Sequence, residues 1–167
     1  MSTGFSIRPY YKELLRLANK HYEVAIFTAG YQWYADPIID YLDPTEELIQ
    51  HRYYRHHATY IESEDIFVKD LRIFEDAVKL ENIVIVDNYI HSFAFHLQNG
   101  IPIVPFYGEQ DDQEFLKLIK YLIFLQGHES LQIANENVFF LQKLNCFQVS
   151  KFIKHYDIEE LQKLEDE

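Results

Sequence analysis

The chain has 167 residues, of which 48% are hydrophobic, with only five glycines and five prolines. This composition argues against a disordered chain and predicts one folded domain with its own core. A formal net charge of −12 disfavours nucleic acid and anionic lipid as partners, because both are bound through clustered lysine and arginine.

The first part of the chain alternates helical and extended patterns. Apolar side chains at helical spacing predict an amphipathic helix over residues 10–20. Residues 24–27 (VAIF) form an apolar run that contains no polar side chain, which is typical of a strand buried on both faces. Residues 31–42 predict a helix in which Pro37 lies near the start or at a kink, and residues 51–54 predict a second strand.

The middle of the chain continues this alternation. Residues 55–67 are polar and irregular, which indicates a loop or a small hairpin, and residues 71–80 predict a helix. Residues 83–86 (IVIV) are the strongest candidate for a buried strand. A short helix is expected over residues 92–97, and residues 101–104 predict a strand whose proline makes it short or places it at an edge.

The pattern changes towards the C-terminus. Two aspartates open a predicted helix over residues 111–123, where acids lie at the positive end of the helix dipole. We expect residues 1–127 to form an α/β domain and residues 128–167 to form a mostly helical C-terminal extension. The apolar stretch 138–144 predicts that this extension packs on the domain or on a partner, and a capping box precedes a last predicted helix at 158–165.

Helices that alternate with short buried strands are typical of an α/β domain with a parallel sheet. In such sheets, functional side chains collect at the carboxyl ends of the strands. Thr28, Lys69 and the pair Asp87 and Asn88 fall at or near such ends. Taken singly, each has a structural explanation: a threonine in a turn, a solvated lysine, an aspartate that caps the next helix.

Five segments taken together are more specific. In chain order they are FTAGYQWYADPIIDYLDP, HRYYR, FVKDL, IVIVDN and NGIPIVPF. They resemble the small C-terminal-domain phosphatases (NLI-interacting-factor-like) of the haloacid dehalogenase superfamily, including those that dephosphorylate the tail of RNA polymerase II and a mitochondrial import-translocase subunit. The resemblance covers residues 8 to about 125. It implies a Rossmann-like haloacid dehalogenase fold with a central parallel sheet.

The resemblance also implies roles for the candidate residues. In that family a DxDx(T/V) loop supplies an aspartate that attacks phosphorus and a second that acts as general acid and base. By resemblance, Thr28 and Lys69 match the phosphate-binding residues, and Asp87 and Asn88 match the pair that helps to hold Mg²⁺. A hydroxyl, an ammonium and a magnesium ion suit a phosphoryl group in transfer, because its charge is spread over three oxygens.

The sequence departs from this pattern at its start. The first aspartate is Asp36, so we expect the DxDx(T/V) loop and the central strand that carries it to be missing. Thr28, Lys69 and Asp87 are then remnants of the site and are not expected to be active. A metal site at Asp87 and Asn88 is expected to be weak or lost, and no cofactor is expected unless the full protein supplies the missing segment and with it Mg²⁺.

A second departure follows Asn88, where Tyr89 and Ile90 stand in place of the usual Ser-Pro. Larger apolar side chains there are expected to fill space beside the former pocket.

Two functions from different classes follow. The first is a catalytically inactive phosphatase-like domain that serves as a structural or protein-binding subunit of a larger assembly, in which a partner chain is one source of the missing strand. The alternative is a Mg²⁺-dependent protein serine/threonine phosphatase of the RNA polymerase II C-terminal-domain type, whose catalytic N-terminal part is absent from this chain. A third hypothesis, a peptide-binding module in mitochondria, ranks last.

Features of the whole chain predict its surroundings. Cys146 is the single cysteine, so no internal disulfide is expected and a reducing compartment inside the cell is the default. No apolar run has the length of a membrane span, and the first residues resemble neither a signal peptide nor a transit peptide. The cytoplasm is expected first, with mitochondria or the nucleus as alternatives, and other protein subunits are the expected partners.

Two side-chain clusters have both a functional and a structural interpretation. One is aromatic and would form either a peptide-binding face or a mixture of core and surface cover: Tyr31, Trp33, Tyr34, Tyr53, Tyr54 and Tyr60. The other is a histidine group whose spacing matches no standard zinc pattern, which favours a polar loop over a metal site: His51, His56 and His57.

Overall fold

The structure of the chain is a computed structural model that describes residues 5–141. Its α-helices are α1 (Tyr11–Asn19), α2 (Gln32–Leu42), α3 (Glu114–Leu125) and α4 (Leu131–Phe139). Its strands are β1 (Ala25–Phe27), β2 (His51–Tyr53), β3 (Thr59–Ile61), β4 (Ile66–Val68), β5 (Ile85–Asp87) and β6 (Gly100–Pro102). Short 3-10 turns occupy much of the region between β4 and β6.

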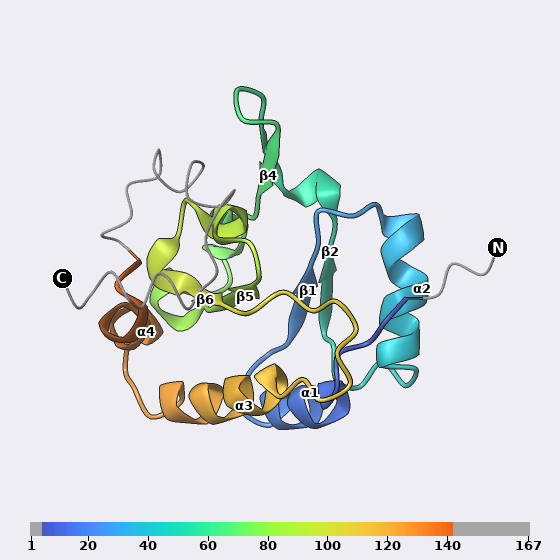
Figure 1. The fold of residues 1–167 in the computed structure, drawn as a ribbon. Helices are drawn as coiled ribbons and strands as arrows, with labels where there is room; N and C mark the ends of the chain where they lie inside the picture. The colour runs from blue at the N-terminus through green and yellow to red at the C-terminus, as the bar shows by residue number, and fades with distance from the viewer. Residues whose placement is uncertain (1–4, 142–167) are drawn as a thin grey trace.

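The strands form three separate pairs. Strand β1 pairs with β2 in parallel, β5 pairs with β6 in parallel, and β3 and β4 form an antiparallel hairpin. Figure 1 shows β1 and β5 as the inner strands of the two parallel pairs, β2 and β6 as the outer strands, and the hairpin projecting away from them. The predicted parallel sheet is therefore present as two parallel pairs with no strand pairing between them in the described part of the chain.

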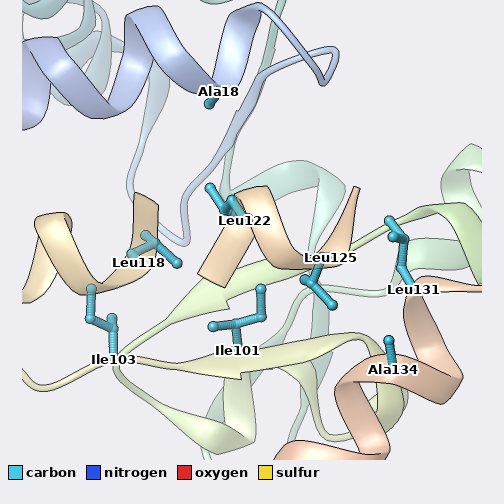
Figure 2. Packing of buried hydrophobic residues seen from close by; sticks show 8 residues of the cluster. All are labelled: Ala18, Ile101, Ile103, Leu118, Leu122, Leu125, Leu131 and Ala134. Carbon is cyan, nitrogen blue, oxygen red and sulfur yellow. The ribbon is translucent and has the colours of Figure 1, made fainter. Parts of the chain in front are cut away.

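The largest core cluster lies where α1 and α3 pack beneath the strands. Helix α3 forms because leucines recur at helical spacing on one face, and burial of that face drives its packing. The buried members of the cluster, labelled in Figure 2, are Ala18, Ile101, Ile103, Leu118, Leu122, Leu125, Leu131 and Ala134. A second cluster joins α2 to the parallel pair β1–β2: Ala35, Ile39, Ile49 and Tyr54.

Most of the predicted elements are confirmed. Helices α1, α2 and α3 overlap the predicted stretches 10–20, 31–42 and 111–123, and α3 extends two residues further, to Leu125. Pro37 lies inside α2, and the hairpin β3–β4 spans residues 59–68. The Rossmann-like fold class is confirmed by comparison with solved structures, described below.

Two predicted helices, over residues 71–80 and 92–97, are wrong. These stretches contain the 3-10 turns η2 (Leu71–Phe74), η3 (Leu80–Asn82), η4 (Ile90–Phe93) and η5 (Leu97–Asn99). The fully buried Asn99 side chain donates to the carbonyl oxygens of Leu80 and Ile83, at 2.7 and 2.8 Å. The buried Asn99 amide thus fixes the chain at and just after Leu80, where backbone carbonyls have no partner within a helix.

The strand over residues 24–27 was predicted to be buried on both faces, and this is wrong for the described part of the chain. Ala25 is exposed, and Ile26 and Phe27 are only half-buried. The physical reason is that β1 pairs with β2 alone among the described strands, so its other edge carries no neighbouring strand.

The first part of the predicted C-terminal extension is helical. Helix α4 places Leu131 and Ala134 in the largest core cluster, and the buried Asn135 donates to the carbonyl oxygens of Gln98 and Gly100 at 2.9 and 2.5 Å. Cys146 and the helix predicted at 158–165 lie outside the described residues. The predicted domain boundary after residue 127 stays a prediction.

Among residues 5–141, no helix has both the length and the apolar character needed to cross a membrane. The compartment of the protein stays a prediction.

The contact between Gly100 and Phe93 generates a first testable prediction. A Cβ on Gly100 would come within 2.0 to 2.7 Å of ring carbons of Phe93, which is fully buried. We expect Gly100→Ala to lower the free energy of unfolding by about 2 kcal/mol or more, because overpacking forces a buried ring to move. Urea unfolding followed by circular dichroism measures this change.

The matched control is Gly127→Ala, at an exposed position where the nearest atom to a new Cβ, the Phe124 carbonyl oxygen, is 3.7 Å away. Its effect should stay within about 0.5 kcal/mol. Equal stability of the two variants would contradict the prediction.

Candidate functional site

The candidate site forms where the ends of three strands meet. Asp87 is the last residue of β5, Lys69 follows β4, and Thr28 follows β1. The Lys69 Nζ lies 2.5 Å from Asp87 Oδ2, and the two side chains are only 11% and 8% exposed. The same Nζ lies 6.0 Å from the centroid of the Phe27 ring. Phe27 is the residue directly before Thr28. The structure therefore brings the predicted Lys69 and Asp87 into direct contact beside the end of β1.

Local hydrogen bonds hold this ion pair in place. The Asp87 Oδ1 accepts a bond from the backbone N–H of Tyr89 at 2.8 Å, so both carboxylate oxygens are engaged. The backbone N–H of Lys69 donates to the carbonyl of Ser92 at 2.6 Å, which ties the segment after β4 to the turn after β5. Because the pair is buried, its charges are compensated by each other more than by water.

Thr28 occupies a tight turn at the end of β1. Its Oγ1 accepts a hydrogen bond from the backbone N–H of Gly30 at 2.9 Å, and its own backbone N–H donates to the carbonyl of Tyr53 at 2.9 Å. These contacts are those of a turn residue, and the hydroxyl keeps its proton as a donor. The roles of Thr28 and Lys69 in phosphate binding stay predictions.

The sequence predicts that Tyr89 and Ile90, which follow Asn88, fill space beside the site, and only one of the two side chains is packed in a core. Asn88 is exposed, and Tyr89 is 50% exposed with its ring 5.2 Å from that of His91. Ile90 packs against the buried cluster that includes Phe93. Tyr89 therefore does not fill buried space, while Ile90 contributes to a core.

The described residues do not by themselves fit a magnesium ion. Mg²⁺ prefers an octahedron of oxygen ligands, and Asp87 already shares its oxygens with Lys69 and a backbone N–H. Residues 5–141 contain no group of three or more histidine, cysteine, aspartate or glutamate side chains arranged to hold a metal. A metal at this site would need further ligands and would have to compete with Lys69 for Asp87.

A neighbouring charged cluster was missed by the sequence analysis. Asp70 is buried and accepts hydrogen bonds from the Arg72 guanidinium, at 2.5 Å from Nη2, and from His96 Nε2 at 2.8 Å. The Arg72 bonds are the main cause that holds the pKa of Asp70 well below its ordinary value, against the opposing effect of burial. The sequence feature that could have indicated this cluster is the position of Asp70 directly after Lys69 in FVKDL.

His91 lies close to the ion pair. Burial lowers the pKa of His91, although the charge of Asp87 acts in the opposite direction. We therefore expect this imidazole to be neutral near pH 7.

Arg55 links the end of β1 to the β3–β4 hairpin. Its Nε donates to the carbonyl of Ala29 at 2.5 Å, and its guanidinium lies 4.4 Å from the Tyr31 ring centroid and 4.7 Å from that of Phe67. Next to it, Tyr31, Trp33 and Tyr34 are 54%, 75% and 58% exposed. Of the predicted aromatic cluster, these three residues and Tyr60 are exposed, whereas Tyr54 belongs to the core.

The other candidate groups have structural partners. Asp36 accepts a hydrogen bond from the Tyr54 hydroxyl, which together with Arg52 keeps the pKa of Asp36 below its ordinary value. Asp43 is buried and accepts bonds from two backbone N–H groups, those of Leu48 and Ile49. Within residues 5–141, Asp87 is the one carboxylate within ion-pair distance of Lys69.

The histidine group has contacts typical of a polar loop. His51 bonds to Glu23, and His57 Nδ1 accepts a bond from the backbone N–H of Tyr54.

Comparison with known proteins identifies the family. The sequence profile of the NLI interacting factor-like phosphatases matches residues 1–132. The chain belongs to this family. The predicted resemblance is therefore confirmed, and it accounts for the order of the five sequence segments along the chain.

Several curated relatives are similar over most of the chain. CTD small phosphatase-like protein 2 of Dictyostelium discoideum is 33% identical over 82% of the chain, and CTD small phosphatase-like protein 3 of Caenorhabditis elegans is 38% identical over 70%. Nuclear envelope morphology protein 1 of Schizosaccharomyces pombe is 37% identical over 71% of the chain. The chain spans only 23%, 39% and 24% of the lengths of these three relatives.

The fold is also found among solved structures. The fission yeast RNA polymerase II CTD phosphatase Fcp1, bound to beryllium fluoride, superposes with a TM-score of 0.51 over 95% of this chain and 45% of its own. Sequence identity is 18%, so this likeness concerns the fold alone.

The buried ion pair generates a prediction on stability. We expect Lys69→Met to lower the free energy of unfolding by about 3 kcal/mol, because it leaves the Asp87 charge buried and unpaired. Asp87→Asn should also destabilise, and the double variant should lose less than the sum of the two single changes by at least about 1 kcal/mol. A double-mutant cycle in urea measures this coupling.

The control is Lys79→Met in the ion pair with Glu81, whose side chains are 79% and 46% exposed. It should change stability by less than about 0.5 kcal/mol. Strict additivity of the Lys69 and Asp87 changes would show that the two side chains do not interact.

The Asp70 cluster generates a prediction on pH dependence. Because the pKa of Asp70 is lower in the folded than in the unfolded chain, its ionised form stabilises the fold above the unfolded value of about 4. That contribution is lost as the pH falls towards the folded-state pKa. We expect stability to fall less steeply below about pH 5 in Asp70→Asn than in the wild type, as measured by urea unfolding at several pH values.

Asp76→Asn, at an exposed position, provides the comparison and should leave the pH dependence as in the wild type. An unchanged slope in Asp70→Asn would refute the assignment of this acid sensitivity to Asp70.

Proposed function

We propose that a polypeptide of this sequence is a phosphatase-like domain that does not hydrolyse phosphoesters by itself and acts as a protein-binding subunit of a larger assembly. One observation carries the proposal: Lys69, the candidate phosphate-binding cation, is paired with Asp87 in a buried contact. No second carboxylate among residues 5–141 is placed against it.

The chemistry supports this view. Phosphoryl transfer through a covalent intermediate needs a nucleophile positioned in line with the leaving group, and positioning cannot replace an absent nucleophile. The sequence has no aspartate before Asp36. Asp36 itself accepts a hydrogen bond from the Tyr54 hydroxyl, and Asp43 accepts a bond from the backbone N–H of Leu48.

The surface beside the site supports a binding role. Tyr31, Trp33 and Tyr34 are more than half exposed, next to the turn that holds Thr28. Aromatic side chains of this kind are enriched in protein interfaces, because they bury a large area with few rotatable bonds. The net charge of −12 favours a partner with basic segments.

The alternative is a Mg²⁺-dependent protein serine/threonine phosphatase of the RNA polymerase II C-terminal-domain type. It is favoured by the gathering of Lys69, Asp87 and the end of β1 at one place, and by relatives named CTD small phosphatase-like proteins. In this alternative a DxDx(T/V) segment from elsewhere in the whole protein supplies the nucleophile and, with Asp87 and Asn88, the ligands of Mg²⁺.

A phosphatase assay on the chain alone separates the two functions. We expect no Mg²⁺-dependent release of phosphate from p-nitrophenyl phosphate or a phosphoserine peptide beyond that seen with Lys69→Met. Lys79→Met serves as a control for protein quality. Turnover that requires Mg²⁺ and is abolished by both Lys69→Met and Asp87→Asn would overturn the proposal and establish the alternative.

A further inference from the structure

Helices α1 and α3 carry cations that no acid neutralises. Lys12 and Arg16 in α1, Lys20 at its C-cap and Lys120 in α3 are exposed. No carboxylate of residues 5–141 lies within ion-pair distance of these four side chains, which we call the basic face. The other lysines and arginines of that range have carboxylate or carbonyl partners: Arg8, Arg52, Arg55, Lys69, Arg72, Lys79 and Lys117.

The cations of α1 form a line along the exposed side of the helix. Lys12, Arg16 and Lys20 follow one another at four-residue intervals, and Lys20 keeps right-handed helical dihedrals (φ −70°, ψ −24°). Four residues advance an α-helix by about 6 Å and return close to the same side, so the three charges span about 12 Å. The Lys12 Nζ lies 5.8 Å from the Tyr11 ring centroid, a contact that leaves its charge without an acid.

Helix α3 adds the fourth cation at the same level of the helix pair. Ala18 of α1 packs in one cluster with Leu122 of α3, and the Tyr22 hydroxyl donates to the Leu122 carbonyl at 2.6 Å. Lys20 stands between Ala18 and Tyr22 in the chain. Lys120 stands two residues before Leu122, so the two lysines lie at one level of the pair. Figure 1 shows α1 and α3 side by side at the bottom of the view.

Exposed apolar side chains adjoin Lys120 on α3. Ile123 and Phe124, three and four residues further along the helix, are 41% and 49% exposed. Residues at these spacings are neighbours on a helix surface. A partner can therefore bury apolar area here while it neutralises the cations beside it.

The net charge of −12 restricts the kind of anion that fits. A bilayer or a nucleic acid presents charge over a surface wider than α1, and would also approach exposed acids beside the cations, such as Glu13 and Glu23. Interactions between exposed charges are screened over about 8 Å at physiological ionic strength. A narrow acidic segment responds to the nearby cations more than to the charge of the whole chain.

The construction of the basic face favours a helix as that segment. The face consists of side chains on two helices, so it offers no strand edge to pair with. An extended segment docked there would leave backbone groups without partners, whereas an α-helix satisfies its own N–H and C=O groups. Glutamates four residues apart on a helix also repeat every 6 Å or so, as the cations of α1 do.

We propose that the basic face binds an acidic α-helix of a partner protein. Carboxylates at positions i, i+4 and i+8 of that helix pair with Lys12, Arg16 and Lys20. An apolar side chain beside them contacts Ile123 and Phe124. This inference rests on the proposed protein-binding function and names a kind of partner. The surface lies away from the exposed aromatic residues at the start of α2, as Figure 1 shows.

The test measures the binding of three fluorescein-labelled peptides to the full chain by anisotropy. Each has about 20 residues of mainly alanine, glutamine and leucine, because shorter isolated helices are marginal in water. The matched probe carries three glutamates four residues apart, the dispersed probe carries them five residues apart, and the neutral probe carries glutamines instead. Circular dichroism verifies that the probes are equally helical.

The matched probe should bind at least several-fold more tightly than the dispersed probe, whose glutamates lie on different sides of the helix. The neutral probe should show no measurable binding. Equal binding of the matched and dispersed probes would indicate attraction by charge alone and would overturn the inference, as would no binding of either.

Variants of the chain locate the binding. Arg16→Gln should weaken binding of the matched probe about twofold to fivefold, and Gln at Lys12, Arg16 and Lys20 together should weaken it about tenfold or more. Glu13→Gln should strengthen binding, because it removes a like charge. Lys79→Gln, at an exposed lysine outside the basic face, should leave the Kd unchanged. Glutamine is close to lysine and arginine in helix propensity, so α1 should persist.

A charge swap tests the pairing itself. Arg16→Glu should weaken binding of the matched probe about tenfold or more. A probe whose central glutamate is replaced by lysine should bind this variant better than it binds the wild type, because the two changes compensate each other. Lack of this reversal, or unchanged binding of the matched probe by the triple variant, would overturn the inference.

Other occupants are outcomes of the same assay. Binding of phosphatidylserine vesicles tighter than that of the matched probe, and lost in the triple variant, would assign the basic face to a lipid surface. Stronger competition by a peptide of the acidic residues 157–167 would assign it to the chain's own segment. Self-association of the free chain that the triple variant abolishes would assign it to a second copy. Each of these results overturns the inference.

The result is distinguishable from that for the proposed function. Phosphate release by the free chain would overturn the lack of activity and leave probe binding unaffected. Absence of binding of the matched probe would overturn the acidic helix as a partner and leave the activity result unaffected.

Discussion

The ion pair between Lys69 and Asp87 joins two parts of the chain that no strand pairing connects within residues 5–141. Lys69 follows the β3–β4 hairpin, whereas Asp87 ends a strand that pairs with β6. A backbone bond from Lys69 to Ser92 reinforces the junction. Because both side chains are buried, neither charge is well accommodated without the other. The ion pair therefore helps to fix the position of the hairpin over the strand ends, and it balances the two buried charges of the candidate site.

This contact also constrains the chemistry of the site. A phosphate group that approaches Lys69 must compete with a carboxylate already in place, and a metal that approaches Asp87 must compete with an ammonium. Both competitions involve desolvated charges, for which the net free energy is a small difference between large terms.

The chain corresponds to part of the length of its relatives, and its described strands form separate pairs. The chain spans between 23% and 39% of the lengths of three relatives, although the family profile matches most of its residues. Two parallel pairs with facing edges and apolar side chains are in place, and the α-helices that cover them are well packed.

The sequence by itself determined the elements whose evidence is local. Periodicity predicted the helices at 10–20, 31–42 and 111–123, apolar runs predicted strands at 24–27 and 83–86, and the order of motifs predicted the family and the fold. These signals are local because helix and strand periods place apolar side chains on one face. The positions of Thr28, Lys69 and Asp87 after apolar runs also predicted that they lie at strand ends.

Only the tertiary structure decided how distant groups are partnered. It paired Lys69 with Asp87, surrounded Asp70 with Arg72 and His96, and bonded the buried Asn99 amide to the carbonyls of Leu80 and Ile83. None of these contacts follows from periodicity. Each depends on which segments approach in space, where a buried polar group must find a partner whatever its distance along the chain.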